Sequence, residues 1–415
     1  MTELDLGLKA VSRRLLWRLG YSTKVDVPLR AVVSRESTRA TSSPESFTDL
    51  DVLGVAVAAD SSVRSSIVDC KTGGSSVITR MFWLRGLVDF FEADHAYLVR
   101  ERAISKDARQ LALRLNLTAL TEEEVGSLEA LHQTDLPIDE APLSNLFDPN
   151  YIARVIERLT NQHKKLQPLL DYRQFDYWVN PEHQNLVRMV DLLKDSSGVL
   201  DGSSPIHTGI VLDCAWLYVV SAAHALRQLR SVHISDLNYG LSEYLAGGPG
   251  QLAQKREVAA ILDQLKDARQ IPDKVTISVN PHFFAPLLEL LIRLLRRGDL
   301  LTDMLRMLEY QSSASIAGDR VGAEIAFGAR YNRVAAKLAA DVVDFLVGAA
   351  GLDSTFKDVC RELLLGTVSK STAPAPREVA LFDVAAEEGV IEASKPKTSS
   401  NGRSAIGRAS RRSEK

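Results

Sequence analysis

The sequence predicts an N-terminal α/β domain, a small mixed sheet flanked by helices, followed by a mostly α-helical domain. The first part of the chain alternates between helical apolar spacing and short β-rich runs. From about Pro137 onward, nearly every apolar stretch has helical spacing. We therefore place an α/β domain at residues 1–134, a linker at 135–150, a helical domain at 151–366 and a disordered basic tail at 367–415.

Apolar spacing predicts the first helix, and β-rich runs predict three strands after it. Leucine and valine recur at steps of three and four before Gly20, where we expect this helix to end. Residues 22–27 are a short strand candidate. The runs LDVLGVAVA at 50–58 and SIVDC at 66–70 predict two further strands, the first of them nearly all apolar.

The remainder of the first domain alternates helix and strand. Residues 79–91 predict a helix, and AYLV at 96–99 predicts a strand. Ser105 is a candidate N-cap for the next helix, and the strand LTAL follows at 117–120. Thr121 and Glu124 have the spacing of a capping box that opens a last helix. The expected order is α-β-β-β-α-β-α-β-α.

The second part of the chain is expected to be helical and free of membrane spans. Its most apolar stretch, 206–226, contains His207, Asp213 and His224. Polar side chains at these points favour a buried helix over a membrane span, so we expect no membrane partner. The Pro/Asp-rich segment PIDEAPLSNLFDPN precedes this region and is predicted to be a linker.

Composition excludes several function classes. A formal net charge of −3 gives no global field that attracts polyanions, so nucleic acid would need a local basic patch. Cys70, Cys214 and Cys360 stand far apart, which excludes a disulfide framework or a zinc ribbon and suits a reducing compartment. The N-terminal stretch lacks the apolar run of a signal peptide, so we expect a cytoplasmic protein.

Acidic and basic residues gather at the ends of two predicted strands. Asp51 lies at the start of one strand, and the next strand ends with Asp69, Cys70 and Lys71. Side chains alternate along a strand, so Asp69 and Lys71 share one face while Cys70 points to the other. If the two strands are hairpin neighbours, Asp51 lies near that pair at one edge of the sheet. Thr48 and Asp49 would either support this site or cap the strand.

Two carboxylates and an ammonium suit the hydrolysis of a phosphodiester. Asp51 and Asp69 are predicted to bind Mg²⁺ (or Mn²⁺), which accepts carboxylate oxygens and keeps positions open for water and phosphate. Lys71 is predicted to act on the attacking water and on the pentavalent phosphorus. The competing interpretation is an ordinary salt bridge at the end of a strand.

The order of these motifs resembles the restriction-endonuclease-like superfamily of PD-(D/E)xK nucleases and is most similar to the Mrr-type endonucleases. In that family a helix ending in a Gly-aromatic pair leads into a strand, as LWRLGYSTKV does here. An Asp then opens the second strand, matched by Asp51, and an acid-x-Lys closes the third, matched by Asp69 and Lys71. The likeness covers about residues 1–130 and implies a restriction-endonuclease-like domain.

Two features depart from that family. Its members commonly carry a Glu in the first helix, about three turns before the Gly-aromatic pair, where this sequence has Leu8 and Lys9. The Ser/Thr-rich loop at 29–47 is also longer than the family leads us to expect. On the helix after Lys71, Arg80 and Arg85 are candidate phosphate contacts, with a solvated helix face as the alternative.

The resemblance implies a metal-dependent endonuclease that hydrolyses DNA, in defence against foreign DNA. The helical domain would then serve target recognition, homodimerisation or a partner protein. One alternative is a nuclease-fold protein that binds nucleic acid or protein without cutting. The other is a helical scaffold whose N-terminal domain is only structural.

Overall fold

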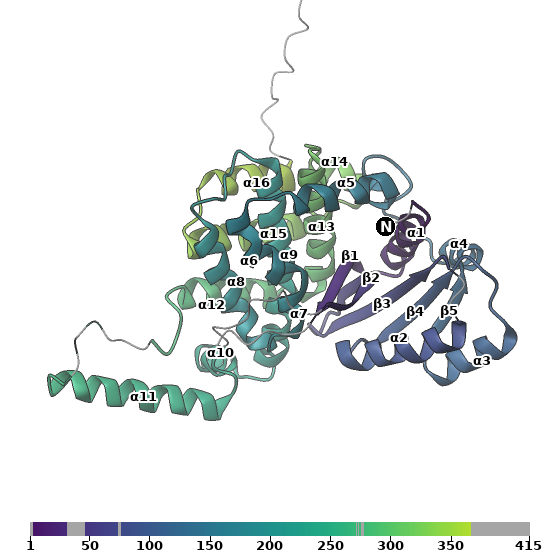
Figure 1. Ribbon diagram of the computed structural model, residues 1–415. Helices are drawn as coiled ribbons and strands as arrows, with labels where there is room; N and C mark the ends of the chain where they lie inside the picture. The colour runs from purple at the N-terminus through teal and green to yellow at the C-terminus, as the bar shows by residue number, and fades with distance from the viewer. Residues whose placement is uncertain are drawn as a thin grey trace, which may run out of the picture. The chain divides into compact units, whose positions relative to one another are not determined.

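The computed structural model describes residues 3–30, 46–73, 76–270, 272, 274 and 278–366. The tail at 367–415, expected to be disordered, and most of the long Ser/Thr-rich loop lie outside the described residues. The described part of the chain is a mixed α+β structure, with a sheet in its N-terminal part and mostly helices after it (Figure 1).

The N-terminal part has the element order that the apolar spacing predicts. Its elements are α1 (Glu3–Arg18), β1 (Ser22–Arg30), β2 (Ser46–Val57), β3 (Val63–Lys71), α2 (Val77–Phe91), β4 (His95–Arg100), α3 (Lys106–Arg114), β5 (Thr118–Thr121) and α4 (Glu122–Leu131).

The described strands form one five-stranded sheet in the order β1-β2-β3-β4-β5. β1, β2 and β3 pair as antiparallel neighbours, whereas β3, β4 and β5 run parallel to one another. Parallel neighbours need a crossover connection, and α2 and α3 supply the two crossovers. The antiparallel β2–β3 pair confirms the hairpin on which the predicted site depends.

Helices cover both faces of this sheet. A small apolar cluster joins α1 and α4 to one face, where Leu15 and Val125 pack against Val68 and Cys70. A larger core contains Ile67 of β3 with Met81 of α2, and α2 and α3 lie on the opposite face from α1 and α4 (Figure 1). The alternating side chains of β3 thus face two cores, which explains why residues 66–70 are buried in succession.

The second part of the described chain is helical as far as Leu365. Its elements are η1 (Leu143–Phe147), α5 (Pro149–Thr160), η2 (Lys164–Leu166), α6 (Gln167–Asp171), η3 (Tyr172–Asp176), α7 (Tyr177–Val179), α8 (Glu182–Ser196), α9 (Pro205–Leu229), η4 (Ile234–Asp236), α10 (Leu237–Ala246), α11 (Pro249–Asp267), α12 (Phe284–Leu295), η5 (Gly298–Leu300), α13 (Leu301–Ala317), α14 (Ala323–Phe327), η6 (Gly328–Arg330), α15 (Arg333–Ala350) and α16 (Thr355–Leu365).

The apolar stretch at 206–226 forms α9, at the centre of this helical part. Among the described residues, α9 is the one helix long and apolar enough to cross a membrane, and 94% of its most apolar window is buried in the protein. Its Asp213 is buried and forms ion pairs with Lys24 and Arg173. Buried partners for this charge fit a core helix.

The segment at 135–150, expected to be a linker, is packed against the rest of the chain. It contains η1, and Leu143 and Leu146 are fully buried. The apolar side chains of this Pro/Asp-rich stretch are thus part of the hydrophobic core. The described residues up to Gly366 form one compact unit.

A buried carboxylate ties the sheet to the helical part. Glu309 of α13 accepts hydrogen bonds from Arg13 Nη2 at 2.7 Å, from Ser22 Oγ at 2.6 Å and from the backbone N–H of Thr23 at 2.7 Å. The Trp17 indole N–H donates to the same carboxylate at 3.1 Å. These donors come from α1 and β1, so Glu309 fixes both elements against α13.

Candidate functional site

Asp51 lies where the β2–β3 ladder ends. The last residues that pair between these strands are Val52 and Val68, and Asp51 is the next residue of β2. Because β2 begins at Ser46, Asp51 lies inside the strand and not at its start, where the sequence predicts it. Beyond the Val52–Val68 pair, the side chain of Asp51 supplies the next hydrogen bond to β3. Its Oδ2 accepts a hydrogen bond from the backbone N–H of Cys70 at 2.7 Å. This bond satisfies a buried donor and fixes the carboxylate toward β3.

Asp69 and Lys71 lie on the neighbouring strand and meet Asp51. The Lys71 ammonium lies 3.7 Å from Asp51 Oδ2 and 3.5 Å from Asp69 Oδ1. Cys70 between them is buried on the other face, where its Sγ lies 3.4 Å from Ser12 Oγ of α1. The structure therefore brings together the three residues that the sequence selected.

Arg80 and Arg85 of α2 are paired with carboxylates. Arg80 Nε donates to Asp69 Oδ2 at 2.6 Å, and its Nη2 donates to Asp69 Oδ1. The guanidinium also stacks 3.4 Å from the centre of the Trp83 ring. Arg85 pairs with Asp89 one turn further along α2. The guanidinium of Arg80 thus binds Asp69, a contact that neither a phosphate site nor a solvated helix face predicts.

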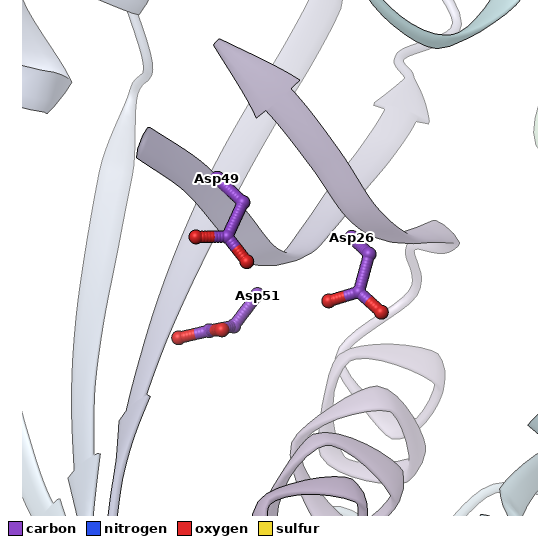
Figure 2. A group of neighbouring side chains, drawn as sticks. All are labelled: Asp26, Asp49 and Asp51. Carbon is purple, nitrogen blue, oxygen red and sulfur yellow. The ribbon is translucent and has the colours of Figure 1, made fainter. Parts of the chain in front are cut away.

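Two further carboxylates lie beside Asp51: Asp26, which the sequence did not indicate, and Asp49, for which support of the site was one of two interpretations. Ligand oxygens of Asp26, Asp49 and Asp51 all lie within 4.8 Å of one another. Figure 2 shows the three side chains close to one another; Asp26 comes from β1, and Asp49 and Asp51 come from β2. Asp49 shares the strand of Asp51, two residues earlier. Asp26 has a φ of 55°, which departs from strand geometry and re-aims its side chain.

Lys9 of α1 neutralises part of this acidic group. Its ammonium lies 3.2 Å from Asp5 Oδ2, 2.6 Å from Asp26 Oδ1 and 3.1 Å from Asp51 Oδ1. Burial alone would lower the pKa of Lys9, but the charges of Asp51 and Asp26 raise it above its ordinary value. In the sequence, Lys9 is marked only by its difference from the PD-(D/E)xK pattern, which commonly has a Glu in this part of the first helix.

Burial dominates the electrostatics of the carboxylates. It raises the pKa of Asp51 to about 6, with a further upward contribution from Asp69, against the opposing effects of Lys9, the Cys70 N–H and Lys71. Burial also raises the pKa of Asp26. A carboxyl group in such surroundings ionises at lower cost when another cation arrives.

The named side chains leave an excess of negative charge. They are five carboxylates and three cations: Asp5, Asp26, Asp49, Asp51 and Asp69 with Lys9, Lys71 and Arg80. When all five carboxylates are ionised, these eight side chains carry a net charge of −2, the charge that one divalent cation would neutralise.

Three of the carboxylates, Asp26, Asp49 and Asp51, are arranged in a way that suits a hard divalent cation. Oxygens on opposite sides of an octahedral Mg²⁺ lie about 4.2 Å apart, so Asp26, Asp49 and Asp51 need only a small closure around the ion. Asp69 is not part of this group, and Arg80 engages both of its oxygens. A metal bound jointly by Asp51 and Asp69 would therefore compete with Arg80 for Asp69.

No family model matches this chain, and no curated protein or solved structure is found to be similar to it. The resemblance to the PD-(D/E)xK nucleases therefore rests on the residues quoted above and on their order along the chain.

Proposed function

We propose that the chain is a metal-dependent nuclease that hydrolyses phosphodiester bonds in DNA, with a restriction-endonuclease-like N-terminal domain. The observation that carries this proposal is the position of the Lys71 ammonium, 3.7 Å and 3.5 Å from oxygens of Asp51 and Asp69. Two carboxylates and a lysine meet on two adjacent strands, with Asp51 inside β2 and with Asp69 and Lys71 at the end of β3, in the order of the family motif.

The side chains divide the work of hydrolysis between them. Asp51 and Asp69 would hold Mg²⁺ or Mn²⁺, which supplies positive charge against the phosphate and lowers the pKa of a bound water. Lys71 is 31% exposed, so its ammonium can reach a substrate from solvent while it stays beside both carboxylates. There it would orient the attacking water and donate a hydrogen bond to an oxygen of the pentavalent phosphorus.

Lys9, Asp26 and Asp49 would set the net charge of the proposed metal site. Lys9 is nearly fully buried and holds Asp26 and Asp51 in place. Asp26, Asp49 and Asp51 would bind the ion first, because the oxygens of these three carboxylates already lie close together. Asp69 would join them when its hydrogen bonds to Arg80 break. The net charge of the group favours uptake of a divalent cation over a monovalent one.

The direct test is incubation of the purified full chain with plasmid and with single-stranded DNA, in the presence of Mg²⁺, Mn²⁺ or EDTA. The proposal expects cleavage with a metal and none with EDTA. Lys71→Ala should remove cleavage, and Lys106→Ala, an exposed lysine of the same domain, is the matched control. Equal cleavage by wild type and Lys71→Ala would place the active site elsewhere.

A second candidate, a nuclease-fold module that binds nucleic acid without cutting it, is favoured by one specific feature. Lys9 and Arg80 supply protein cations to Asp51 and Asp69, so the carboxylates have partners without any metal. Under this alternative, wild type shifts DNA in a binding assay but never cleaves it, and neither Mn²⁺ nor EDTA alters its thermal melting.

A further inference from the structure

A cavity of about 120 Å³ lies between the sheet and the helical part, and Asp26 of the acidic group forms part of its wall. Its walls come from β1, α5, η3, α7, α9 and α13, with contributions from Arg13 of α1. One side is apolar and includes Val155, Ile156 and Leu159 of α5 and Ile316 of α13. The other side carries charged groups, so the cavity has a polar end and an apolar end.

One group of three side chains at the charged end of the cavity has one positive charge in excess. Of the six charged residues in the wall, Glu309 pairs with Arg13 and Asp26 pairs with Lys9, which leaves Lys24, Arg173 and Asp213. Lys24 and Arg173 both form ion pairs with the single carboxylate of Asp213. Two cations therefore share one anion, in a place where water can screen them only weakly.

Arg173 has a donor that the described protein does not use. Its Nη1 is buried and has no hydrogen-bond partner among the described residues, although Nε donates to Asp213. A buried charged donor without an acceptor is costly, and such groups in native proteins usually point to a missing partner. The unused donor thus belongs to the same group that carries the excess positive charge.

We propose that this cavity binds a small organic anion with one carboxylate and a short apolar body. A single negative charge balances the excess of the Lys24–Arg173–Asp213 group, and a carboxylate matches the fork of a guanidinium. The apolar body fits against α5 and Ile316. Inorganic phosphate suits the cavity less well, because at neutral pH it carries more than one charge and has no apolar part to cover the walls.

The probes that test this site are hexanoate and benzoate, with hexanamide, benzamide and inorganic phosphate as comparisons. Titration calorimetry on the full chain should detect one molecule of a carboxylate per chain, and the same carboxylate should raise the melting temperature. The uncharged amides should bind at least ten-fold more weakly. Absence of carboxylate binding, equal binding of the amides, or preference for phosphate would each overturn the proposal.

Variants then locate the binding in this cavity. Arg173→Gln should weaken carboxylate binding at least ten-fold while Lys24 still pairs with Asp213. Ser313→Leu projects a larger side chain from a wall residue and should block the cavity without altering its charges, whereas Ser313→Ala is the matched control that keeps binding. If Arg173→Gln fails to fold, the Ser313 pair decides, and undiminished binding by Ser313→Leu would refute the site. Because binding is the readout, the result does not depend on nuclease activity.

Discussion

The ammonium of Lys9 lies 3.1 Å from Asp51 Oδ1, and the two side chains are 3% and 5% exposed. A helix residue thus supplies a buried positive charge to the carboxylate that the family motif assigns to metal binding. The same ammonium also contacts Asp26 at 2.6 Å. Lys9 therefore neutralises part of the acidic group, and in the nuclease proposal it limits how much charge the metal must supply.

Replacement of Lys9 by Met tests how far the acidic group depends on this positive charge. We expect Lys9→Met to lower the free energy of unfolding by about 3–5 kcal/mol in EDTA, because it leaves buried carboxylates without their cation. Saturating Mn²⁺ should restore part of this loss, about 2.7 kcal/mol when the free metal is 100 times its Kd. Urea unfolding with and without Mn²⁺ measures both quantities.

Lys9→Arg is the control for this variant, since it keeps the charge. It should show a smaller loss and a smaller response to Mn²⁺. If Mn²⁺ stabilises Lys9→Met no more than it stabilises wild type, the acidic group does not bind the metal.

Stability in the absence of metal should fall as the pH rises from about 4 to above 6. The pKa of Asp51 is raised to about 6 in the folded protein, whereas an unfolded Asp titrates near 3.9. Between these values the folded state holds the proton and the unfolded state has lost it, so the stabilisation present below pH 4 is lost as pH rises. One such group accounts for about 3 kcal/mol over this window.

Asp51→Asn isolates this contribution, because other carboxyl groups titrate in the same range. The difference in unfolding free energy between Asp51→Asn and wild type, measured in EDTA, should shift in favour of the variant from pH 4.5 to pH 7.5. A difference independent of pH would mean that Asp51 is supported as an ion in the fold. In wild type, Mn²⁺ should raise the melting temperature more at pH 7.5 than at pH 5, since the metal needs the ionised carboxylate.

The elements of the sheet could be predicted because their signals are local. Ser105 caps α3 by accepting the backbone N–H of Ala108 at 3.2 Å, and Thr121 and Glu124 form the capping box at the start of α4. Caps and periodic apolar residues are separated by only a few positions, so the sequence displays them directly. The approach of Asp51 to Asp69 followed from one further assumption, that the two strands form a hairpin.

The partners of the site could not be predicted, because they depend on distant contacts. Lys9 reaches Asp51 from another element, and the turn of Asp26 out of strand geometry carries no mark in the sequence. Leu143 and Leu146 are buried in a stretch whose proline and aspartate content favoured a linker. In each case tertiary packing decides the outcome, and neither composition nor periodicity records it.

Replacement of Arg80 tests whether Asp69 binds the metal. Arg80→Gln removes the guanidinium that engages both oxygens of Asp69. If Asp69 binds the metal, the variant should need less Mn²⁺ for half-maximal stabilisation, by about ten-fold for each 1.4 kcal/mol of competition removed. If Arg80 instead contacts phosphate, the metal response stays constant and DNA affinity falls. Arg85→Gln on the same helix is the control, because Arg85 pairs with the exposed Asp89.

Lys71→Ala separates catalysis from folding and from metal binding. The ammonium lies 3.5 Å and 3.7 Å from its carboxylates and is partly exposed, so we expect its loss to change stability by no more than about 1 kcal/mol. Cleavage should fall by about 10²–10³-fold, the loss typical when one donor to a developing negative charge is removed. The rise in melting temperature with Mn²⁺ should persist, since the carboxylates hold the ion. A variant that loses the metal response together with cleavage would show that Lys71 maintains the site's structure, whereas a variant that keeps full cleavage would remove Lys71 from the mechanism.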